Sequence, residues 1–339
     1  GVLASHSREA SREPFLRGAL ARHSGQPFSV VIMLDLGIVI VSYNTRGLLR
    51  TCLRSVYASQ GDVTFEVCVV DNGSSDGSAD MVAAEFPQAR LIANTENRGY
   101  PAANNQGLRS FGFSASPSSS VGVHIPRFAL LLNSDTEVPP DALATMLDFM
   151  RDRPDAGVAG PKLVRPDGSL DLACRRSFPT PEVSFYRMTG LSKLFPHSPR
   201  FGRYNLTYLD PDQLTEVDSV VGAFMLVRGE AIREAGLMDE SFFMYGEDLD
   251  WAYRMKDAGW KIYYNPAVTV LHVKKASTRQ NPRAQVEFYR AMEIFYRKHY
   301  AAEAPWWVHV LIIGAISTRL KLEQVRVALS PPRAQETVS

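Results

Sequence analysis

The sequence predicts an α/β fold, in which a Rossmann-like and mostly parallel β-sheet is flanked by helices. Two observations predict it. Short runs of β-branched residues alternate with stretches of helical spacing in the first half of the 339 residues, and this alternation favours parallel strands joined by right-handed crossovers. In addition, 45% of the residues are hydrophobic and 22% are charged, so the chain can bury a large core.

The first half contains the repeated strand–helix units. Residues 37–42 (GIVIVS) form a continuous apolar run, which is typical of a strand buried on both faces. Later strands are expected at 65–70, 90–93 and 128–132. Helices are expected over 46–58, 76–85, 101–110 and 139–151, the last with prolines in its first turn.

The second half has a different pattern. Residues 162–170 predict a hairpin around a Pro-Asp-Gly turn. Residues 178–213 are rich in proline, aromatic residues and arginine, with weak periodicity, and we expect an irregular region on the acceptor side. Strands are expected within 217–227 and at 260–264 and 268–272, and helices over 247–258, 285–300 and 306–327.

Composition suggests how the chain is divided. Residues 1–32 lack a long apolar run and predict a disordered extension, with Met33 as a candidate natural start. The main domain is expected over 33–300, with a nucleotide-binding half at 37–160 and an acceptor-binding half at 161–300. Residues 301–339 are expected to form a C-terminal helix and tail.

Charge and cysteine content restrict the partners. The 37 basic and 36 acidic residues nearly cancel, whereas nucleic-acid binding usually requires a basic surface. The three cysteines have neither the paired spacing of a zinc site nor a disulfide pattern. We therefore expect a cytoplasmic protein that does not bind nucleic acid.

Polar segments follow each of the first four predicted strands, at 43–45, 71–77, 94–99 and 133–136. Ligands bind at the carboxyl ends of strands in open α/β sheets, so these segments predict a site for a polar ligand such as a nucleotide. Asp71 could accept a hydrogen bond from a base or ribose there, or it could merely stabilise a turn.

Two further residues could bind a metal. Asp135 follows an apolar strand, and Mg²⁺ and Mn²⁺ prefer carboxylate ligands. A bound cation would neutralise a diphosphate leaving group. His272 ends another apolar strand and gains interest beside a metal site. The alternatives are a helix cap for Asp135 and a structural role for His272.

Three acids lie at the start of a predicted helix, where the helix dipole alone favours negative charge. Glu247, Asp250 and Arg254 fall on one stripe by their spacing, which suits an ion pair. Asp248 points about 160° away from Asp250 at about 100° per residue. It is thus free to act as a general base toward an acceptor hydroxyl.

Taken in order, these segments resemble the family 2 glycosyltransferases, which have a GT-A-type fold. The resemblance covers about 37–300. Its matching stretches are 38–44, 69–77, 96–100 with 105–107, 132–136, 246–250, and His272 with Ser277 and Thr278.

The resemblance implies an inverting, metal-dependent transfer of a sugar from a nucleotide-diphosphate donor. Asp71 is then the base-binding acid, Asp135 and His272 are the ligands of Mg²⁺ or Mn²⁺, and Asp248 is the general base. The other implied donor contacts are Ser42, Tyr43, Asn44, Asn97, Arg98, Gly99, Asn105, Asn133, Ser134 and Asp135 itself. In one departure from the family pattern, Asn133 replaces the first acid of the Asp-x-Asp motif.

Residues 221–228 and 239–245 are similar to the bacterial rhamnosyltransferase branch of that family. This implies dTDP-L-rhamnose as donor and a cell-surface glycan or its lipid-linked precursor as acceptor. Another donor, such as a UDP-sugar, stays open because donor identity varies on one scaffold.

The segment 306–316 is the most apolar of the chain and is followed by basic residues. It could lie on the inner face of the cell membrane. Alternatively, it could pack on the domain or mediate a homodimer.

Three other classes fit less well. A nucleotidylyltransferase would need a glycine-rich phosphate loop after the first strand, and a dinucleotide oxidoreductase would need Gly-x-Gly-x-x-Gly there; residues 43–47 supply neither. A non-enzymatic glycan-binding module would leave Asp135, Asp248 and His272 unexplained as a set.

Overall fold

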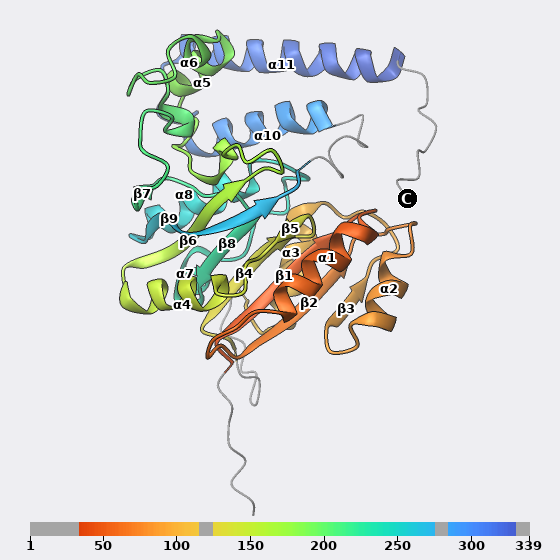
Figure 1. Cartoon of the computed structure of the whole chain (residues 1–339). Helices are drawn as coiled ribbons and strands as arrows, with labels where there is room; N and C mark the ends of the chain where they lie inside the picture. Colours follow the sequence, from red (N-terminus) through yellow and green to blue (C-terminus); the bar gives the residue numbers. More distant parts are fainter. Residues whose placement is uncertain (1–33, 115–124, 275–283, 330–339) are drawn as a thin grey trace, which may run out of the picture. The chain divides into compact units, whose positions relative to one another are not determined.

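The computed structural model describes residues 34–114, 125–274 and 284–329 (Figure 1). The extension expected over 1–32 lies outside the described residues, and so do Ser277 and Thr278. The domain boundaries expected at 33 and 300 stay predictions.

A single sheet organises the described residues. Its order is β3-β2-β1-β4-β8-β6-β9-β5, and β7 pairs with β9. The strands are β1 (Leu36–Ser42), β2 (Phe65–Asp71), β3 (Arg90–Ala93), β4 (Phe128–Asn133), β5 (Thr136–Glu137), β6 (Ala156–Val164), β7 (Thr215–Val217), β8 (Phe224–Arg228) and β9 (Lys261–His272).

Strand direction changes across this sheet. The strands β3, β2, β1 and β4 are parallel to one another, as the strand–helix alternation predicts. Beyond β4 the sheet is mixed, because β8 runs antiparallel to both β4 and β6 while β6 and β9 are parallel. The α/β class is confirmed, and the parallel part coincides with the expected nucleotide-binding half.

Helices flank this sheet (Figure 1). They are α1 (Arg46–Tyr57), α2 (Ser78–Glu85), α3 (Tyr100–Ser110), α4 (Ala142–Asp152), α5 (Pro181–Met188), α6 (Leu191–Leu194), α7 (Gly229–Ala235), α8 (Glu247–Asp257), α10 (Ala284–His299) and α11 (Trp306–Leu329). The helix α11 packs on α10, and the two lie at one end of the molecule. Nowhere in the described ranges is a helix long and apolar enough to cross a membrane.

The core confirms why β1 is apolar on both faces. Ile38, Val39 and Ile40 are fully buried, and β1 lies between β2 and β4 in the middle of the parallel part. Hydrophobic side chains that alternate up and down a central strand contact helices on both faces. This rigid centre fixes the loops that follow each strand.

Three expectations for the second half need correction. The segment 162–170 makes the expected turn, closed by the bridge between Val164 and Leu170 and by a hydrogen bond from the N–H of Arg165 to the carbonyl of Ser169, but it forms no paired hairpin strands, because 162–164 end the long strand β6, which pairs in parallel with β9. The strands expected at 260–264 and 268–272 are one strand, β9. The region 178–213 contains the helices α5 and α6, which a short, aromatic-rich pattern did not reveal.

Candidate active site

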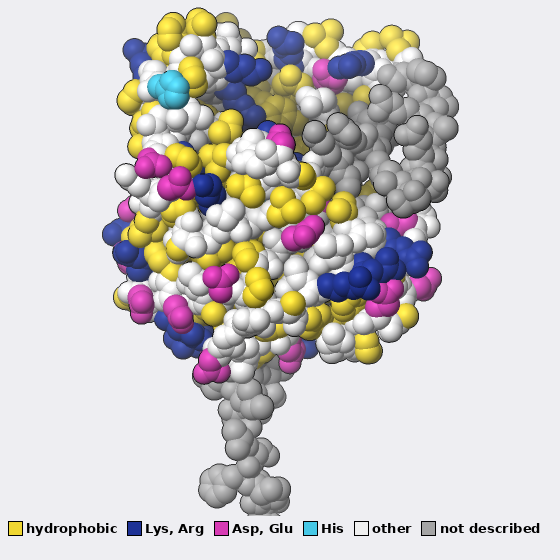
Figure 2. Space-filling view, in the orientation of Figure 1, with side chains coloured by type: hydrophobic (Ala, Val, Ile, Leu, Met, Phe, Trp, Pro, Cys, Tyr) yellow, Lys and Arg dark blue, Asp and Glu magenta, His cyan; other side chains and the backbone are white. Residues whose placement is uncertain are grey.

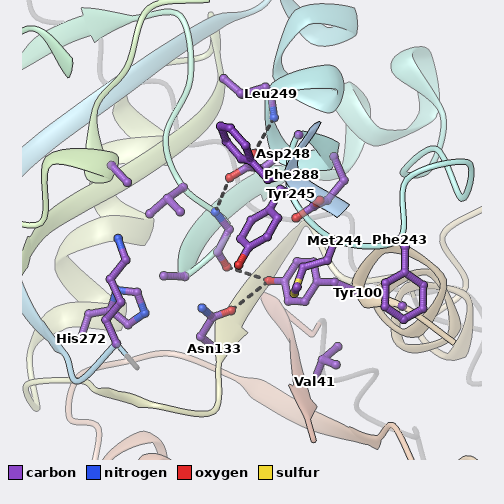
Figure 3. A pocket seen from close by; sticks show the side chains of 18 of the residues that line it. Val41, Tyr100, Asn133, Phe243, Met244, Tyr245, Asp248, Leu249, His272 and Phe288 are labelled. Carbon is purple, nitrogen blue, oxygen red and sulfur yellow. Dashed lines mark hydrogen bonds between the residues drawn. The ribbon is translucent and has the colours of Figure 1, made fainter. Parts of the chain in front are cut away.

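A cavity of about 500 Å³ lies at the carboxyl ends of β1 and β4 (Figure 3). Parallel strands bring their ends together at this edge, so the segments that follow them meet there. Of the predicted site residues, eight line the cavity: Tyr43, Asn97, Gly99, Asn133, Ser134, Asp135, Asp248 and His272. The predicted residues Ser42, Asn44, Asp71, Arg98 and Asn105 are not among its lining residues.

Asp71 ends β2 and is buried. Its Oδ2 accepts a hydrogen bond from the backbone N–H of Ser74 at 3.1 Å, whereas its Oδ1 is buried without a partner in the part of the chain that the structure describes. A buried polar atom normally has a partner. The neighbouring residues Val41 and Asn72 line the cavity, whereas Asp71 itself lies behind this lining.

Ser42 and Asn44 connect the loops instead of lining the cavity. The hydroxyl of Ser42 lies 2.9 Å from that of Thr45, which in turn lies 2.9 Å from the hydroxyl of Ser134. The Oδ1 of Asn44 accepts from the backbone N–H of Ser75 at 2.8 Å. These bonds hold the ends of β1, β2 and β4 in register.

The loop before α3 is held in the same way. The Oδ1 of Asn97 accepts from the side-chain amide of Asn72 and from the backbone N–H of Gly99, both at 3.0 Å, and the backbone N–H of Arg98 donates to Asn72. Gly99 has a positive φ of 85°, and a Cβ there would meet the carbonyl oxygen of Phe243 at 2.7 Å. Glycine therefore permits the loop before α8 to approach.

Asn105 has a structural environment in this protein. Its side chain bonds both the N–H and the carbonyl of Met238 and also donates to Glu240 at 2.8 Å. Each polar atom of its side chain is thus used in attaching α3 to the segment before α8. The structure therefore does not bring Asn105 together with the other predicted donor contacts.

Asp135 and His272 face each other, with Oδ1 and Nε2 3.4 Å apart. The end of β4 and the end of β9 bring them together, since β5 pairs with β9 at His272. The other ring nitrogen, Nδ1, lies 2.9 Å from Oδ2 of Asp171, which also accepts from Lys274. Burial would lower the pKa of His272, but its hydrogen bonds with the two carboxylates raise the pKa to about 9. Positive charge is thus favoured at this point.

Sequence reasoning missed Asp171. It is almost fully buried, and burial would raise its pKa, but hydrogen bonds from His272 and Lys274 hold that pKa well below its usual range. A carboxylate that orients a histidine in this way is common behind metal-binding histidines. Asp171 lies in a turn-rich segment of no periodicity. Its role becomes evident only from its contact with His272, which lies 101 residues away along the chain.

Asp248 lies on the opposite side of the cavity (Figure 3) and accepts hydrogen bonds from three donors. Its Oδ2 accepts from Arg176 at 2.7 Å and from the backbone N–H of Gly222 at 3.1 Å, and its Oδ1 accepts from the N–H of Leu249 at 2.8 Å. Arg176 was also missed, because it lies in the segment of weak pattern. Its buried guanidinium stabilises the negative charge on Asp248.

Glu247 departs from the predicted ion-pair stripe. Arg254 pairs with Asp250 at 2.9 Å, as the spacing predicts, but Glu247 lies at the first position of α8 and lines the cavity. The left-handed conformation of Gly246 places it there. Burial, followed by the negative charge of Asp248, raises the pKa of Glu247 to about 8. Its Oε2 has no partner among the described residues.

Tyr100 connects the two sides. Its hydroxyl lies 2.9 Å from the carbonyl of Gly222 and 3.1 Å from Oδ1 of Asn133 (Figure 3). Both oxygens are acceptors, so the amide nitrogen of Asn133 stays available to donate toward a ligand.

Comparisons with known proteins agree with this geometry. The model of "Glycosyl transferase family 2" matches residues 37–208, and that of "Glycosyl transferase family group 2" matches residues 128–300. An N-acetylglucosaminyl-diphospho-decaprenol L-rhamnosyltransferase of Mycobacterium tuberculosis is 29% identical over 274 residues, which cover 80% of this chain and 86% of that protein. A low-salt glycan biosynthesis hexosyltransferase of Haloferax volcanii is 25% identical over 238 residues, 70% of this chain and 67% of that one.

Among solved structures, GalNAc-T7 with UDP, GalNAc and Mn²⁺ aligns with a TM-score of 0.52 at 14% identity. The alignment covers 88% of this chain and 57% of that chain, so this chain matches little more than half of it and shares its fold. With the family matches along most of the main domain and the sheet edge described above, the chain belongs to glycosyl transferase family 2, and it is a rhamnosyltransferase-like glycosyltransferase with a GT-A-type fold.

Proposed function

We propose that this enzyme transfers L-rhamnose from dTDP-L-rhamnose to a hydroxyl of a lipid-linked precursor or cell-surface glycan, with inversion. The observation that carries the proposal is the arrangement of two pairs of charged side chains on opposite sides of one cavity. Asp135 and His272 lie on one side, and Asp248, paired with Arg176, lies on the other. The printed name of the Mycobacterium tuberculosis relative supports rhamnose and a diphospho-decaprenol acceptor.

Asp135 and His272 would hold Mg²⁺ or Mn²⁺. A carboxylate oxygen and an imidazole nitrogen suit such a cation, and Asp171 would fix the orientation of the imidazole. In the described part of the chain, no three His, Cys, Asp or Glu side chains surround one point, so water and donor oxygens would complete the coordination. The bound cation would neutralise the diphosphate leaving group.

The nucleotide would lie over the ends of β1 and β2. The unpartnered Oδ1 of Asp71 supports a hydrogen bond from a base N–H, and Tyr43 and Asn97 line the adjoining wall. The diphosphate would then extend toward Ser134 and Asp135. The side-chain amide of Asn133 would donate a hydrogen bond to the diphosphate. An aspartate at this position, as in the Asp-x-Asp motif, would instead repel the phosphate charge.

Asp248 would act as the general base. Its neighbour Glu247 holds a proton at neutral pH, because burial and the charge of Asp248 raise its pKa to about 8, whereas Asp248 accepts a hydrogen bond from Arg176 at 2.7 Å. Two adjacent carboxyl groups in different environments can take different roles. The acceptor oxygen would attack the anomeric carbon as its proton moves to Asp248. The bond from that carbon to the diphosphate would break, releasing the nucleoside diphosphate.

A second donor class has its own support. The Haloferax volcanii relative is named only as a hexosyltransferase, and the structural neighbour was solved with UDP and GalNAc. A UDP-sugar is therefore the alternative donor for the same cavity.

A thermal-shift screen of nucleotide sugars, followed by assay of nucleoside-diphosphate release, tests both donors. A ligand that binds only the native state raises apparent stability. We expect dTDP-L-rhamnose with Mn²⁺ to give the largest shift, and EDTA to remove most of it. A shift and release with UDP-sugars alone would overturn the rhamnose assignment, and no release from any nucleotide sugar would overturn the metal-dependent scheme.

A further inference from the structure

The helix α11 carries apolar side chains on the face directed away from the molecule. Its inner side packs on α10, where Ile316 is buried. At about 100° per residue, five apolar residues fall within a sector of about 60° that is roughly opposite Ile316. They are Trp307, Leu311, Leu322, Val325 and Leu329, with exposed fractions of 55%, 65%, 58%, 56% and 80%.

The helices α5 and α6, with Phe195 directly after α6, also carry exposed apolar side chains. Phe185, Met188, Leu194 and Phe195 are between 47% and 69% exposed. In Figure 1 these two short helices lie at the same end of the molecule as α11, and Figure 2 shows apolar and basic side chains along that end. Single exposed apolar residues are ordinary, but an aligned group of them marks a contact surface. We call the nine residues of α5, α6 and α11 the apolar end.

Basic residues border the stripe on α11. By the same helical spacing, Arg319 and Arg326 lie on one side of it and Lys321 on the other. Glu323, the single acid of this helix, lies 3.6 Å from Arg326. Apolar side chains including tryptophan, bordered by lysine and arginine, are typical of helices that lie in a membrane interface.

We propose that the apolar end binds the surface of a bilayer that contains anionic phospholipids. The positive charge of the border complements such lipids. The helix α10 carries α11 on one side and contributes Gln285 and Phe288 to the cavity. Membrane binding would therefore hold the cavity near a lipid-linked acceptor, a consequence that rests on the proposed function.

Co-sedimentation of the full chain with vesicles tests the proposal. We expect binding to phosphatidylcholine vesicles containing phosphatidylglycerol at low salt, and much weaker binding to phosphatidylcholine alone or at high salt. Leu311→Ser with Leu322→Ser should lower the partition coefficient about tenfold or more, because two apolar contacts are lost. Replacing Arg319, Lys321 and Arg326 by glutamine should lower it about 100-fold, at roughly fivefold per charge.

The matched control is Ile125→Ser with Leu214→Ser, since both side chains are apolar and 40% and 44% exposed but lie outside the apolar end. This variant should bind vesicles like the wild type, and thermal unfolding should show that both double variants remain folded. Equal vesicle binding by the two double variants would overturn the proposal, as would no binding of the wild type to anionic vesicles at low salt.

Light scattering tests the alternative that a second copy of the chain binds the apolar end. A wild-type dimer that becomes a monomer in the Leu311→Ser, Leu322→Ser variant, without vesicle binding by either, would assign this face to self-association and overturn the lipid proposal. The vesicle assay needs no nucleotide sugar. Its failure is therefore distinguishable from failure of the donor screen, which tests the cavity alone.

Discussion

The two walls of the cavity are built in different ways. The wall at the ends of β1, β2 and β4 consists of loops that bond one another through short polar side chains, as in the series Ser42, Thr45 and Ser134. The opposite wall depends on a single buried ion pair, in which Arg176 reaches Asp248 across 72 residues of sequence. The first wall is fixed by the sheet itself, whereas the second is fixed by contacts between distant segments.

This difference predicts how substitutions behave. On the strand-end wall, a side chain that faces the ligand can be removed with little cost in stability, since the sheet holds the backbone. On the opposite wall, the position of a charged group should decide the effect: a carboxylate that lines the cavity should affect activity, and one that is buried behind it should affect stability. The following variants test that distinction.

The largest effect is expected from Asp135→Ala. We expect no detectable sugar transfer and no Mn²⁺-dependent binding of the nucleotide sugar, because the variant lacks the carboxylate proposed to bind the cation. The midpoint of thermal unfolding should stay close to that of the wild type. The measurement is a Mn²⁺ titration of the donor-induced thermal shift, and wild-type binding in that titration would refute the assignment.

Asp248→Asn should lower turnover roughly 10²–10⁴-fold, the usual effect of losing a general base, with donor binding retained. Its matched control is Asp250→Asn in the same helix. Asp250 is fully buried and pairs with Arg254, Lys298 and His299, so its loss should cost about 3 kcal/mol of stability instead. Steady-state kinetics and denaturant unfolding of both variants decide, and the reverse pattern would contradict the assignment of the base.

Asp171→Asn should weaken Mn²⁺ binding about 10- to 100-fold, the range found when the partner of a metal-binding histidine is changed. Unlike Asp135→Ala, this variant should recover activity at high Mn²⁺ concentration, since both proposed ligands remain. The apparent Mn²⁺ affinity in the transfer assay measures the effect. An unchanged affinity would show that Asp171 serves only to neutralise Lys274.

The smallest effect is expected from the pH dependence of Glu247. Its pKa rises from 4.5 to about 8 in the folded protein, so the folded state keeps a proton that the unfolded state releases between these values. The contribution to stability is therefore complete below pH 4.5 and is lost as pH rises through about 8. Glu247→Gln should gain stability relative to the wild type over this window, by at most about a few kcal/mol. Unfolding midpoints from pH 5 to pH 9 measure this, and a constant difference would contradict it.

The same contrast explains what could be predicted from the sequence. The apolar run at 37–42 and the polar segments after each early strand predict the parallel strands, and parallel strands place their ends together. Asp135 and Asp248 could be predicted as site residues because one follows an apolar strand and the other lies at the start of a helix. Both residues line the cavity.

Residues that depend on distant contacts could not be predicted in this way. Arg176 and Asp171 lie in segments without periodicity, and their partners are far along the chain. Glu247 was misplaced because helical spacing describes a side chain within a helix, whereas this residue begins one after a left-handed glycine. Asn105 fitted the family pattern, yet its bonds to Met238 depend on a loop that no local pattern describes.

Gly222 connects the two walls of the cavity through hydrogen bonds of its backbone. Its carbonyl accepts from Tyr100, which also contacts Asn133, and its N–H donates to Asp248. Any displacement of Asn133 would therefore disturb its hydrogen bond with Tyr100, which is bonded to the same residue as the carboxylate on the far side. The geometry at one wall and the position of the carboxylate on the other are therefore linked through the backbone of one residue.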